Sequence, residues 1–172
     1  WIIKEIGDYG PYVQSERKYL YHIFAKELVS MWLAYPCWMT TEEIENIRDQ
    51  QTKSKIVPWI YGNYSIYRNK SVDELLEKIK LDSNYIIRFR SHGDTQRKII
   101  FKDILKWKVN MWDNYNDIVL IKSDGLPTYH LAHIVDDHLM RVSHVIRAEE
   151  WLTSVPLHLQ LFDAFKLPAP KY

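Results

Sequence analysis

The spacing of apolar residues changes twice along this chain of 172 residues, and this limits the folds open to it. Residues 15–33 repeat apolar side chains about every 3.6 positions, which indicates a helix with Ser15 as its N-cap. From residue 85 to residue 122 the period is near two, as in strands, and after residue 128 helical spacing returns. Helical ends around a β-rich middle predict an α/β domain interrupted by an inserted α+β unit.

Two capping boxes mark the starts of further helices. In each, a hydroxyl side chain can accept a hydrogen bond from the backbone three residues on, and a glutamate reaches back. The box at Thr40–Glu43 predicts a helix to about Gln50, and the box at Ser71–Glu74 predicts one to about Ile79. A short aromatic run at 35–39 is interpreted as a strand.

The middle of the chain is predicted to form four strands. Residues 85–90 and 98–103 are joined by Ser91-His92-Gly93-Asp94, a sequence typical of a hairpin turn. A third strand is expected at 104–109 and a fourth at 118–122.

The C-terminal part is predicted as a helix at 128–139, a strand at 143–147 and a helix at 156–165. Arg147 would then project from the carboxyl edge of a sheet, where open α/β folds bind ligands. A guanidinium there can form a bidentate pair with a carboxylate or a phosphate. The alternative is an ordinary salt bridge to a nearby acid, which could be Glu149, Glu150 or Asp136.

Composition excludes several classes of protein. The single cysteine, Cys37, excludes a disulfide framework and cysteine-based zinc sites, and five glycines cannot supply a Walker loop or a G-x-G-x-x-G turn. The longest run without a charged residue or histidine, Leu28–Thr41, is too short and too polar to span a bilayer. No secretory signal is visible, so we expect a reduced, soluble, cytoplasmic protein.

Positive charge is concentrated in the middle of the chain. Residues 53–108 hold 13 Lys or Arg against 6 Asp or Glu, although the net charge of the whole chain is only +1. Aromatic residues lie among them, at Tyr61, Tyr64, Tyr67, Tyr85, Phe89 and Trp107. This composition suits a surface that binds nucleic-acid phosphates, or it is simply the solvated face of a sheet.

Four of the seven histidines lie within residues 130–144. His130 and His133 share one helical face, and with Asp136, Asp137 or His138 they could hold a metal ion. No H-E-x-x-H or C-x-x-C pattern frames them, so the alternative is that they pack or bond to carboxylates.

Three ordered runs stand close together in the last third of the chain: SDGLPTYHLA at 123–132, VDDHLM at 135–140 and VIRAEEWL at 145–152. Nearer the start, GPYVQSER occupies 10–17, and Ala34-Tyr35 is followed by Thr41-Glu42-Glu43. Together these runs closely resemble the glutamyl-tRNA synthetases, a family of class I aminoacyl-tRNA synthetases, over essentially the whole chain.

The resemblance implies part of a class I synthetase catalytic domain of Rossmann type, interrupted by an α+β domain that binds the acceptor end of tRNA. Residues 1–34 would end the first Rossmann half, 35–125 would form the insertion, and 126–172 would begin the second half. The family's HIGH-like and KMSKS-like elements would lie before Trp1 and beyond Tyr172. We therefore expect an interior fragment that has no catalytic residue of its own and is inactive alone.

The resemblance also implies roles for single residues. The residues expected to bind glutamate are Tyr129, His133 and Arg147, with Arg147 pairing with the substrate carboxylate. Glu150 and Trp151 are expected in the wall next to ATP. His133 stands where relatives often have Asn or a small apolar residue. Arg141 replaces a usual Gly, which we interpret as a surface change.

The family activates glutamate with ATP and transfers it to tRNA(Glu), so ATP, Mg²⁺, glutamate and the tRNA acceptor end are the ligands expected of the parent enzyme. For the fragment we expect no bound cofactor or metal, no membrane contact and no obligate protein partner. Two alternatives are kept: a non-catalytic RNA-binding module, and a metal-dependent hydrolase built on His130, His133 and His138.

Overall fold

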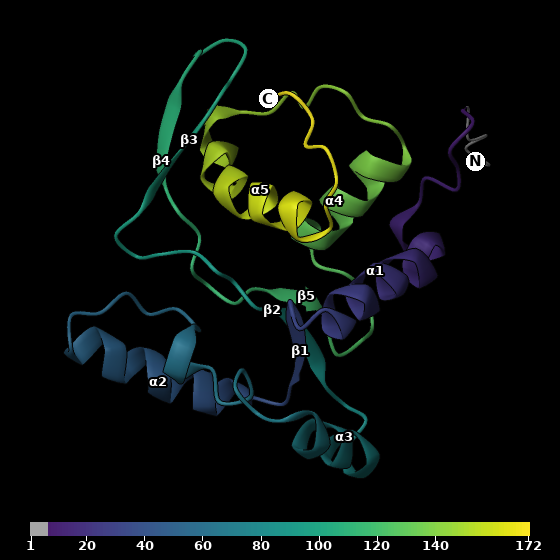
Figure 1. Cartoon of the computed structure of the whole chain (residues 1–172). Helices are drawn as coiled ribbons and strands as arrows, with labels where there is room; N and C mark the ends of the chain where they lie inside the picture. The colour runs from purple at the N-terminus through teal and green to yellow at the C-terminus, as the bar shows by residue number, and fades with distance from the viewer. Residues whose placement is uncertain (1–6) are drawn as a thin grey trace.

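The computed structural model describes residues 7–172 (Figure 1). Its helices are α1 (Lys18–Ser30), α2 (Thr41–Lys53), α3 (Val72–Leu81), α4 (Tyr129–Leu139) and α5 (Val155–Ala164), with short 3-10 helices at η1 (Gln14–Arg17), η2 (Gly62–Tyr64) and η3 (Glu149–Ser154). The strands are β1 (Ala34–Cys37), β2 (Ile86–Phe89), β3 (Lys98–Phe101), β4 (Val109–Trp112) and β5 (Val119–Ile121).

A three-stranded antiparallel sheet, in the order β1-β2-β5, lies at the centre and is covered on both faces. In Figure 1, α4 and α5 lie above this sheet, and α2 and α3 lie below it. The larger core joins the sheet to α1, α4 and α5, and its fully buried members include Tyr21, Leu28, Phe89, Leu120, Leu131, Ile134 and Leu161. The smaller core lies on the opposite face and contains Tyr35, Cys37, Met39 and Ile60. No helix within residues 7–172 is long and apolar enough to cross a membrane.

Both predicted capping boxes are present. The Thr40 hydroxyl accepts from the Glu43 amide at 3.2 Å, and the Glu43 carboxylate accepts from the Thr40 amide at 2.8 Å. Ser71 and Glu74 form the same reciprocal pair at the start of α3. The helices that these boxes predicted are therefore confirmed. The prediction for Ser15 is wrong, because it lies inside the 3-10 helix that precedes α1 and caps nothing.

The predicted hairpin between residues 85–90 and 98–103 is wrong. Strand β2 pairs with β1 on one side and β5 on the other, so it has no free edge for β3. Strand β3 instead pairs with β4, with Lys98 opposite Trp112. Residues 104–107 form a turn rather than a strand, because the Asp103 carboxylate accepts the amides of Leu105 and Lys106 at 2.8 and 2.6 Å. The strand predicted at 118–122 is confirmed as β5.

One buried acid fixes the connections around these strands. Asp117 is fully buried and accepts from the Tyr35 hydroxyl at 2.7 Å and the Ser91 amide at 3.0 Å, and it forms an ion pair with Arg68. Burial raises the pKa of the Asp117 carboxyl, so these three donors are what keep its negative charge tolerable inside the protein. The segment predicted as a hairpin turn is held by this carboxylate instead.

Helices α4 and α5 confirm the two helices predicted near the C-terminus. The strand predicted at 143–147 is wrong, because within the described part of the chain its one ladder contact is a single bridge between His144 and Lys171. Arg147 consequently does not project from a sheet edge and lies in an irregular segment between α4 and η3.

Four helices end on a residue in the left-handed conformation that is not glycine. The residues are Trp32, Lys55, Arg141 and Lys166, with φ between +55° and +61°. At the end of α4, the amide of Arg141 donates to His138 O at 3.2 Å, and that of Val142 to Asp137 O at 2.8 Å, which is a Schellman motif. The interpretation of Arg141 as a surface change is therefore incomplete, because its backbone occupies a position that favours glycine.

Candidate functional site

The residues predicted to bind glutamate are brought together by α4 and the segment after it. Tyr129 and His133 lie four residues apart on one face of α4, and their rings stack at 5.6 Å with an interplanar angle of 24°. Trp151 of η3 contacts Tyr129 at 5.3 Å between ring centroids. Tyr129 and Trp151 are each almost half exposed, so this aromatic wall faces solvent.

Arg147 lies against this wall and is held by neutral groups. Its Nη2 donates to Nε2 of His133 at 3.0 Å. Its Nη1 lies 3.4 Å from Trp151 O and 3.5 Å from Nδ1 of His158. Its guanidinium carbon lies 4.9 Å from the ring centroid of Tyr172. Arg147 thus reaches four partners, and none of them carries a negative charge.

The salt bridges considered for Arg147 are not formed. Among residues 7–172, no ion pair involves this side chain. Asp136 instead pairs with Arg17 at 2.8 Å and accepts from the Tyr21 hydroxyl at 2.8 Å. Glu149 pairs with Lys106. Asp136 and Glu149 are thus paired elsewhere. The charge of Arg147 lowers the pKa of Asp137 against the larger effect of burial, but these two residues form no ion pair, so the hydrogen bonds of Arg147 remain available for an anion.

Burial keeps the neighbouring histidines neutral. It lowers the pKa of His158 to about 2 and that of His133 to about 4, with the charge of Arg147 adding to the effect at both rings. The pKa of His130 is also lowered by burial. Burial raises the pKa of Asp137 to about 6, and its carboxylate lies 3.3 Å from Nε2 of His133. Near neutral pH, uncharged rings therefore line the guanidinium.

The three histidines proposed for a metal site are not assembled. His130 and His133 face His158, with ring centroids 5.3 and 4.5 Å away, whereas His138 contacts Phe24 of α1. Within residues 7–172, no group of three His, Cys, Asp or Glu side chains could hold a metal ion. The geometry gives no support to a hydrolase built on His130, His133 and His138.

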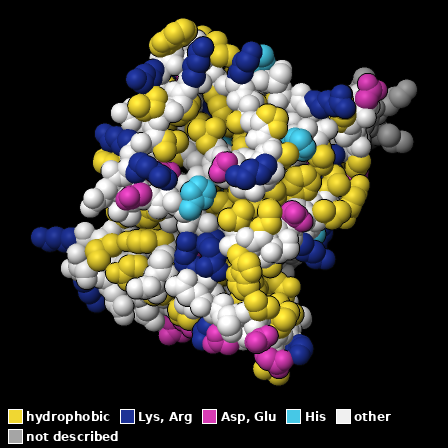
Figure 2. Space-filling view, viewed as in Figure 1, with side chains coloured by type: hydrophobic (Ala, Val, Ile, Leu, Met, Phe, Trp, Pro, Cys, Tyr) yellow, Lys and Arg dark blue, Asp and Glu magenta, His cyan; other side chains and the backbone are white. Residues whose placement is uncertain are grey.

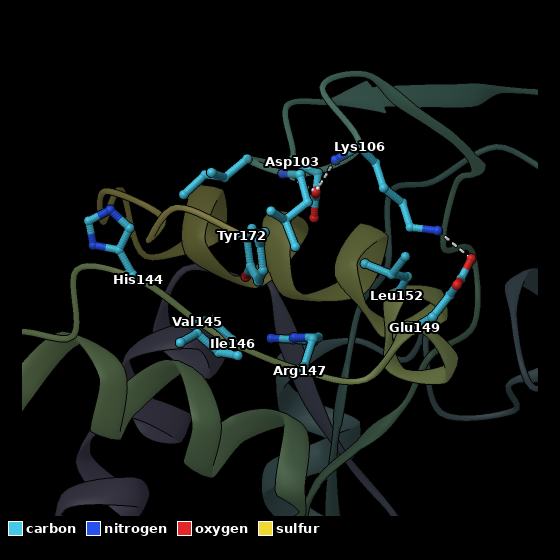
Figure 3. A pocket seen from close by; sticks show the side chains of 11 residues that line it. Asp103, Lys106, His144, Val145, Ile146, Arg147, Glu149, Leu152 and Tyr172 are labelled. Atoms are coloured by element: carbon cyan, nitrogen blue, oxygen red, sulfur yellow. Dashed lines mark hydrogen bonds and ion pairs between the residues drawn. The ribbon is translucent and has the colours of Figure 1, made fainter.

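A cavity of about 590 Å³ opens beside Arg147, with Tyr172 on the same wall (Figure 3). Its lining is largely apolar and includes Leu105, Val145, Ile146 and Leu152. The ion pair of Lys106 and Glu149 lies at one side of it (Figure 3).

The two residues expected near ATP differ in their surroundings. Trp151 belongs to the aromatic wall described above. Glu150 lies exposed at the start of η3, and its backbone oxygen accepts from the Thr153 hydroxyl at 3.1 Å. Its side chain makes no ion pair within the described part of the chain.

Sequence reasoning missed His158 and Tyr172. His158 is fully buried in α5 among apolar residues, and a lone histidine on an otherwise apolar helical face was the available signal. For Tyr172 the sequence offered no signal, because its contact with Arg147 depends on how the chain folds back after α5.

A second hollow, of about 300 Å³, lies on the other side of His130. Its lining is mixed: Arg48, Arg88, Trp59 and His130 lie beside apolar and neutral polar residues, and none of its described lining residues is an acid. Arg88 is 6% exposed and its Nη1 donates to Asp117 O at 2.9 Å, while its Nε has no hydrogen-bond partner among residues 7–172.

Comparison with known proteins identifies the same family as the sequence motifs do, over almost the whole chain. Residues 2–172 match the family model described as tRNA synthetases class I (E and Q), catalytic domain. The glutamate–tRNA ligase of Clostridium perfringens (strain SM101 / Type A) is 47% identical over 168 residues, which are 98% of this chain and 30% of that protein. The ligase of Fusobacterium nucleatum is 46% identical over 96% of this chain and 32% of its own length.

Solved structures agree with the sequence comparison. A crystal structure of a glutamate tRNA ligase from Elizabethkingia meningosepticum in complex with its amino acid superposes with a TM-score of 0.84 at 36% identity. The match covers 98% of this chain and 34% of that one. The chain thus spans about a third of the relatives it matches, and it belongs to the catalytic domain family of the class I glutamyl and glutaminyl tRNA synthetases.

Proposed function

We propose that this chain is the part of a glutamate–tRNA ligase that binds glutamate and the acceptor end of tRNA(Glu) and lies next to ATP. The observation that carries the proposal is Arg147, a partly buried cation without a carboxylate partner among residues 7–172. The identity to glutamate–tRNA ligases supports the choice of substrates. In this proposal residues 1–34 and 126–172 belong to the two Rossmann halves, residues 35–125 form the insertion, and the protein acts in the cytoplasm.

The arrangement around Arg147 suits a carboxylate. A planar guanidinium can donate two parallel hydrogen bonds to the two oxygens of a carboxylate. Because its hydrogen-bond partners are neutral, a bound carboxylate would not have to displace a protein acid from the guanidinium. His133 contacts the guanidinium and stacks with Tyr129, and these two side chains would contact the rest of the amino acid.

Glu150 and Trp151 lie in η3, three and four residues after Arg147, and both are exposed. We assign this exposed part of η3 to ATP. When bound, ATP would supply the adenylyl group that activates the glutamate carboxylate, with pyrophosphate as the leaving group, and these side chains would border it. The described residues offer no group of acidic side chains that would hold Mg²⁺, so we assign no protein ligand to that ion.

The inserted region carries exposed cations beside exposed aromatic rings. On the β3–β4 hairpin, Lys98 Nζ lies 4.6 Å from the ring of Trp112, and Lys102 Nζ lies 4.7 Å from that of Trp107. Figure 2 shows Lys and Arg side chains next to hydrophobic ones in the upper left of the molecule, where Figure 1 places this hairpin. Cations that contact phosphates and rings that stack with bases are the two components of single-strand RNA binding.

The proposal is tested by glutamate-dependent exchange of pyrophosphate into ATP, measured on the full-length protein that contains this chain. We expect exchange with glutamate and little with aspartate or glutamine. Charging of tRNA(Glu) should follow in the same preparation. Absence of exchange with glutamate would refute the assignment.

The second candidate, a non-catalytic RNA-binding module, is favoured by the pairs of lysine and tryptophan on the hairpin. It predicts binding of tRNA without any glutamate-dependent exchange. The same two assays therefore separate the candidates.

A further inference from the structure

We propose that His158 is a positioning residue of the glutamate site, which holds Arg147 through Nδ1 and is itself fixed in the required tautomer by His130. The inference rests on the proposed function, because it concerns the arginine assigned there to the substrate carboxylate. It assigns a role to a buried side chain of α5 that the motifs in the sequence did not single out.

The hydrogen-bonding roles follow from the chemistry of the groups. Arginine only donates, so the contact of 3.5 Å between Nη1 of Arg147 and Nδ1 of His158 requires an unprotonated Nδ1. A neutral imidazole then carries its proton on Nε2. That nitrogen lies 3.1 Å from Nδ1 of His130, which must accept. His130 is thereby left with its proton on Nε2.

Burial makes this arrangement stable against protonation. His158 is 0% exposed and is packed between the rings of His130, His133 and Tyr129, at 5.3, 4.5 and 5.7 Å. A proton on Nδ1 would point a donor at the donor groups of the guanidinium, and their hydrogen bond would be lost. The neutral ring with a free Nδ1 is therefore the form that fits beside Arg147.

Two acceptors on different elements then orient the guanidinium. His133 of α4 holds Nη2 at 3.0 Å, and His158 of α5 faces Nη1. The ring of Tyr172 contacts the guanidinium at 4.9 Å. A planar group held at two nitrogens and over one ring has little freedom to rotate, so its remaining N–H bonds are preoriented for a ligand. The contact at 3.5 Å is long, and substrate binding is expected to shorten it.

The alternative hypothesis is that His158 only fills space in the core. If so, all replacements of similar volume should have the same effect on the KM for glutamate. If His158 positions Arg147, the effect of a replacement depends on which ring nitrogen it imitates.

The test compares His158→Asn with His158→Gln in the full-length protein. The side-chain oxygen of Asn can take the place of Nδ1 and accept from Arg147, whereas the amide nitrogen of Gln can take the place of Nε2 and donate to His130. Leu161→Ala, which empties a fully buried position on the same helix, is the control for lost stability.

We expect His158→Gln to raise the KM for glutamate about 10-fold, because an acceptor for a charged donor is lost. The KM for ATP should change little, and His158→Asn should recover most of the glutamate affinity. Leu161→Ala should lower the thermal midpoint without this selective effect. Equal KM values for glutamate in the Asn and Gln variants would overturn the inference.

A measurement independent of activity covers the case in which the variants fold poorly. The ¹⁵N chemical shifts of His158 in the unaltered chain report which ring nitrogen carries the proton. We expect protonation at Nε2 alone, and protonation at Nδ1 would overturn the inference. If the unaltered protein shows no exchange with glutamate, the proposed function fails. If exchange is normal but the Asn and Gln variants do not differ, only the role of His158 fails.

Discussion

Arg147, which lies between α4 and η3, and the lysines of the β3–β4 hairpin are held in opposite ways. Arg147 is partly buried among neutral histidines and a tyrosine, at fixed distances and without a carboxylate partner in the described part of the chain. Lys98 and Lys102 lie beside the exposed rings of Trp112 and Trp107. The first arrangement fits one planar anion in one orientation, whereas the second fits a chain of phosphates and bases in many.

The difference has a physical origin in desolvation. A cation in a site of low dielectric interacts strongly with one partner, and salt screens that interaction weakly. Exposed lysines gain little from any single partner, but several of them release counterions when they meet a polyanion. Selectivity for a small acid is thus expected near Arg147, and salt-dependent affinity for RNA on the hairpin.

The largest expected effect is the loss of glutamate binding in Arg147→Ala. The lost charge-assisted hydrogen bonds cost about 2–4 kcal/mol when the carboxylate is left without a partner, which raises the KM for glutamate roughly 30- to 1,000-fold. Arg147→Lys should restore only part of this, because an ammonium lacks the planar fork. Steady-state kinetics with varied glutamate and varied ATP would show it.

If Arg147 were only structural, the thermal midpoint of Arg147→Ala would fall while the KM for glutamate stayed normal. A stable variant with normal glutamate kinetics would remove Arg147 from the site and end the contrast with the hairpin.

The next largest effect concerns stability in acid. The pKa of His158 is lowered to about 2 and that of His133 to about 4, so below the unfolded value of about 6.5 the unfolded chain binds more protons than the folded one. Stability should therefore fall as the pH drops from 6.5 towards 4, by up to about 1.4 kcal/mol per pH unit for each of these two histidines. Asp137, with a pKa raised to about 6, acts in the opposite direction and offsets part of the loss.

Denaturant unfolding at several pH values checks this prediction. His158→Asn removes one titrating ring and should flatten the dependence between pH 6.5 and 4. A dependence as steep as in the unaltered protein would show that His158 is not buried in its neutral form.

Much of the fold could be predicted from the sequence where the interactions are local. The boxes at Thr40–Glu43 and Ser71–Glu74 complete their hydrogen bonds within four residues, and both helices were placed correctly. The hairpin at 91–94 was wrong because the pairing of β2 depends on β1 and β5, which lie far away in the chain.

The ends of helices were harder to place, since Trp32, Lys55, Arg141 and Lys166 occupy a conformation for which glycine is the usual signal.

In the candidate site too, local features could be predicted from the sequence, whereas contacts between distant segments could not. Tyr129 and His133 could be placed on one helical face from their spacing alone. The partnership of His130 with His158 spans 28 residues, and its approach to Arg147 requires an irregular segment that the sequence suggested was a strand. The motif identified the residues, and only the fold shows that the hydrogen-bond partners of the arginine are neutral groups rather than acids.

A smaller effect is expected on the hairpin from the double variant Lys98→Ala with Lys102→Ala. If both lysines contact phosphates, the slope of the logarithm of tRNA affinity against that of salt concentration should become shallower by about 0.7–0.9 for each. The KM for glutamate in the exchange reaction should not change. Lys166, an exposed lysine paired with Asp163 on α5, offers a control substitution that leaves the slope as it was.

The smallest expected effect is a gain of stability in Arg141→Gly. Arg141 has φ of +56° at the end of α4, and the left-handed conformation costs a residue with a Cβ about 1–2 kcal/mol that glycine does not pay. Against this stand the greater freedom of glycine in the unfolded chain and the loss of the contact between the guanidinium and the ring of Tyr9, at 5.8 Å. We expect a net stabilisation below about 1 kcal/mol, measured by denaturant unfolding.

Because Arg141 lies outside both the Arg147 cluster and the hairpin, neither the KM for glutamate nor the salt slope should change. A changed KM for glutamate or a changed salt slope would mean that the end of α4 sets the position of His133 and Asp137. The Arg147 cluster and the hairpin would then differ in how they are coupled to α4 as well as in how they hold their cations.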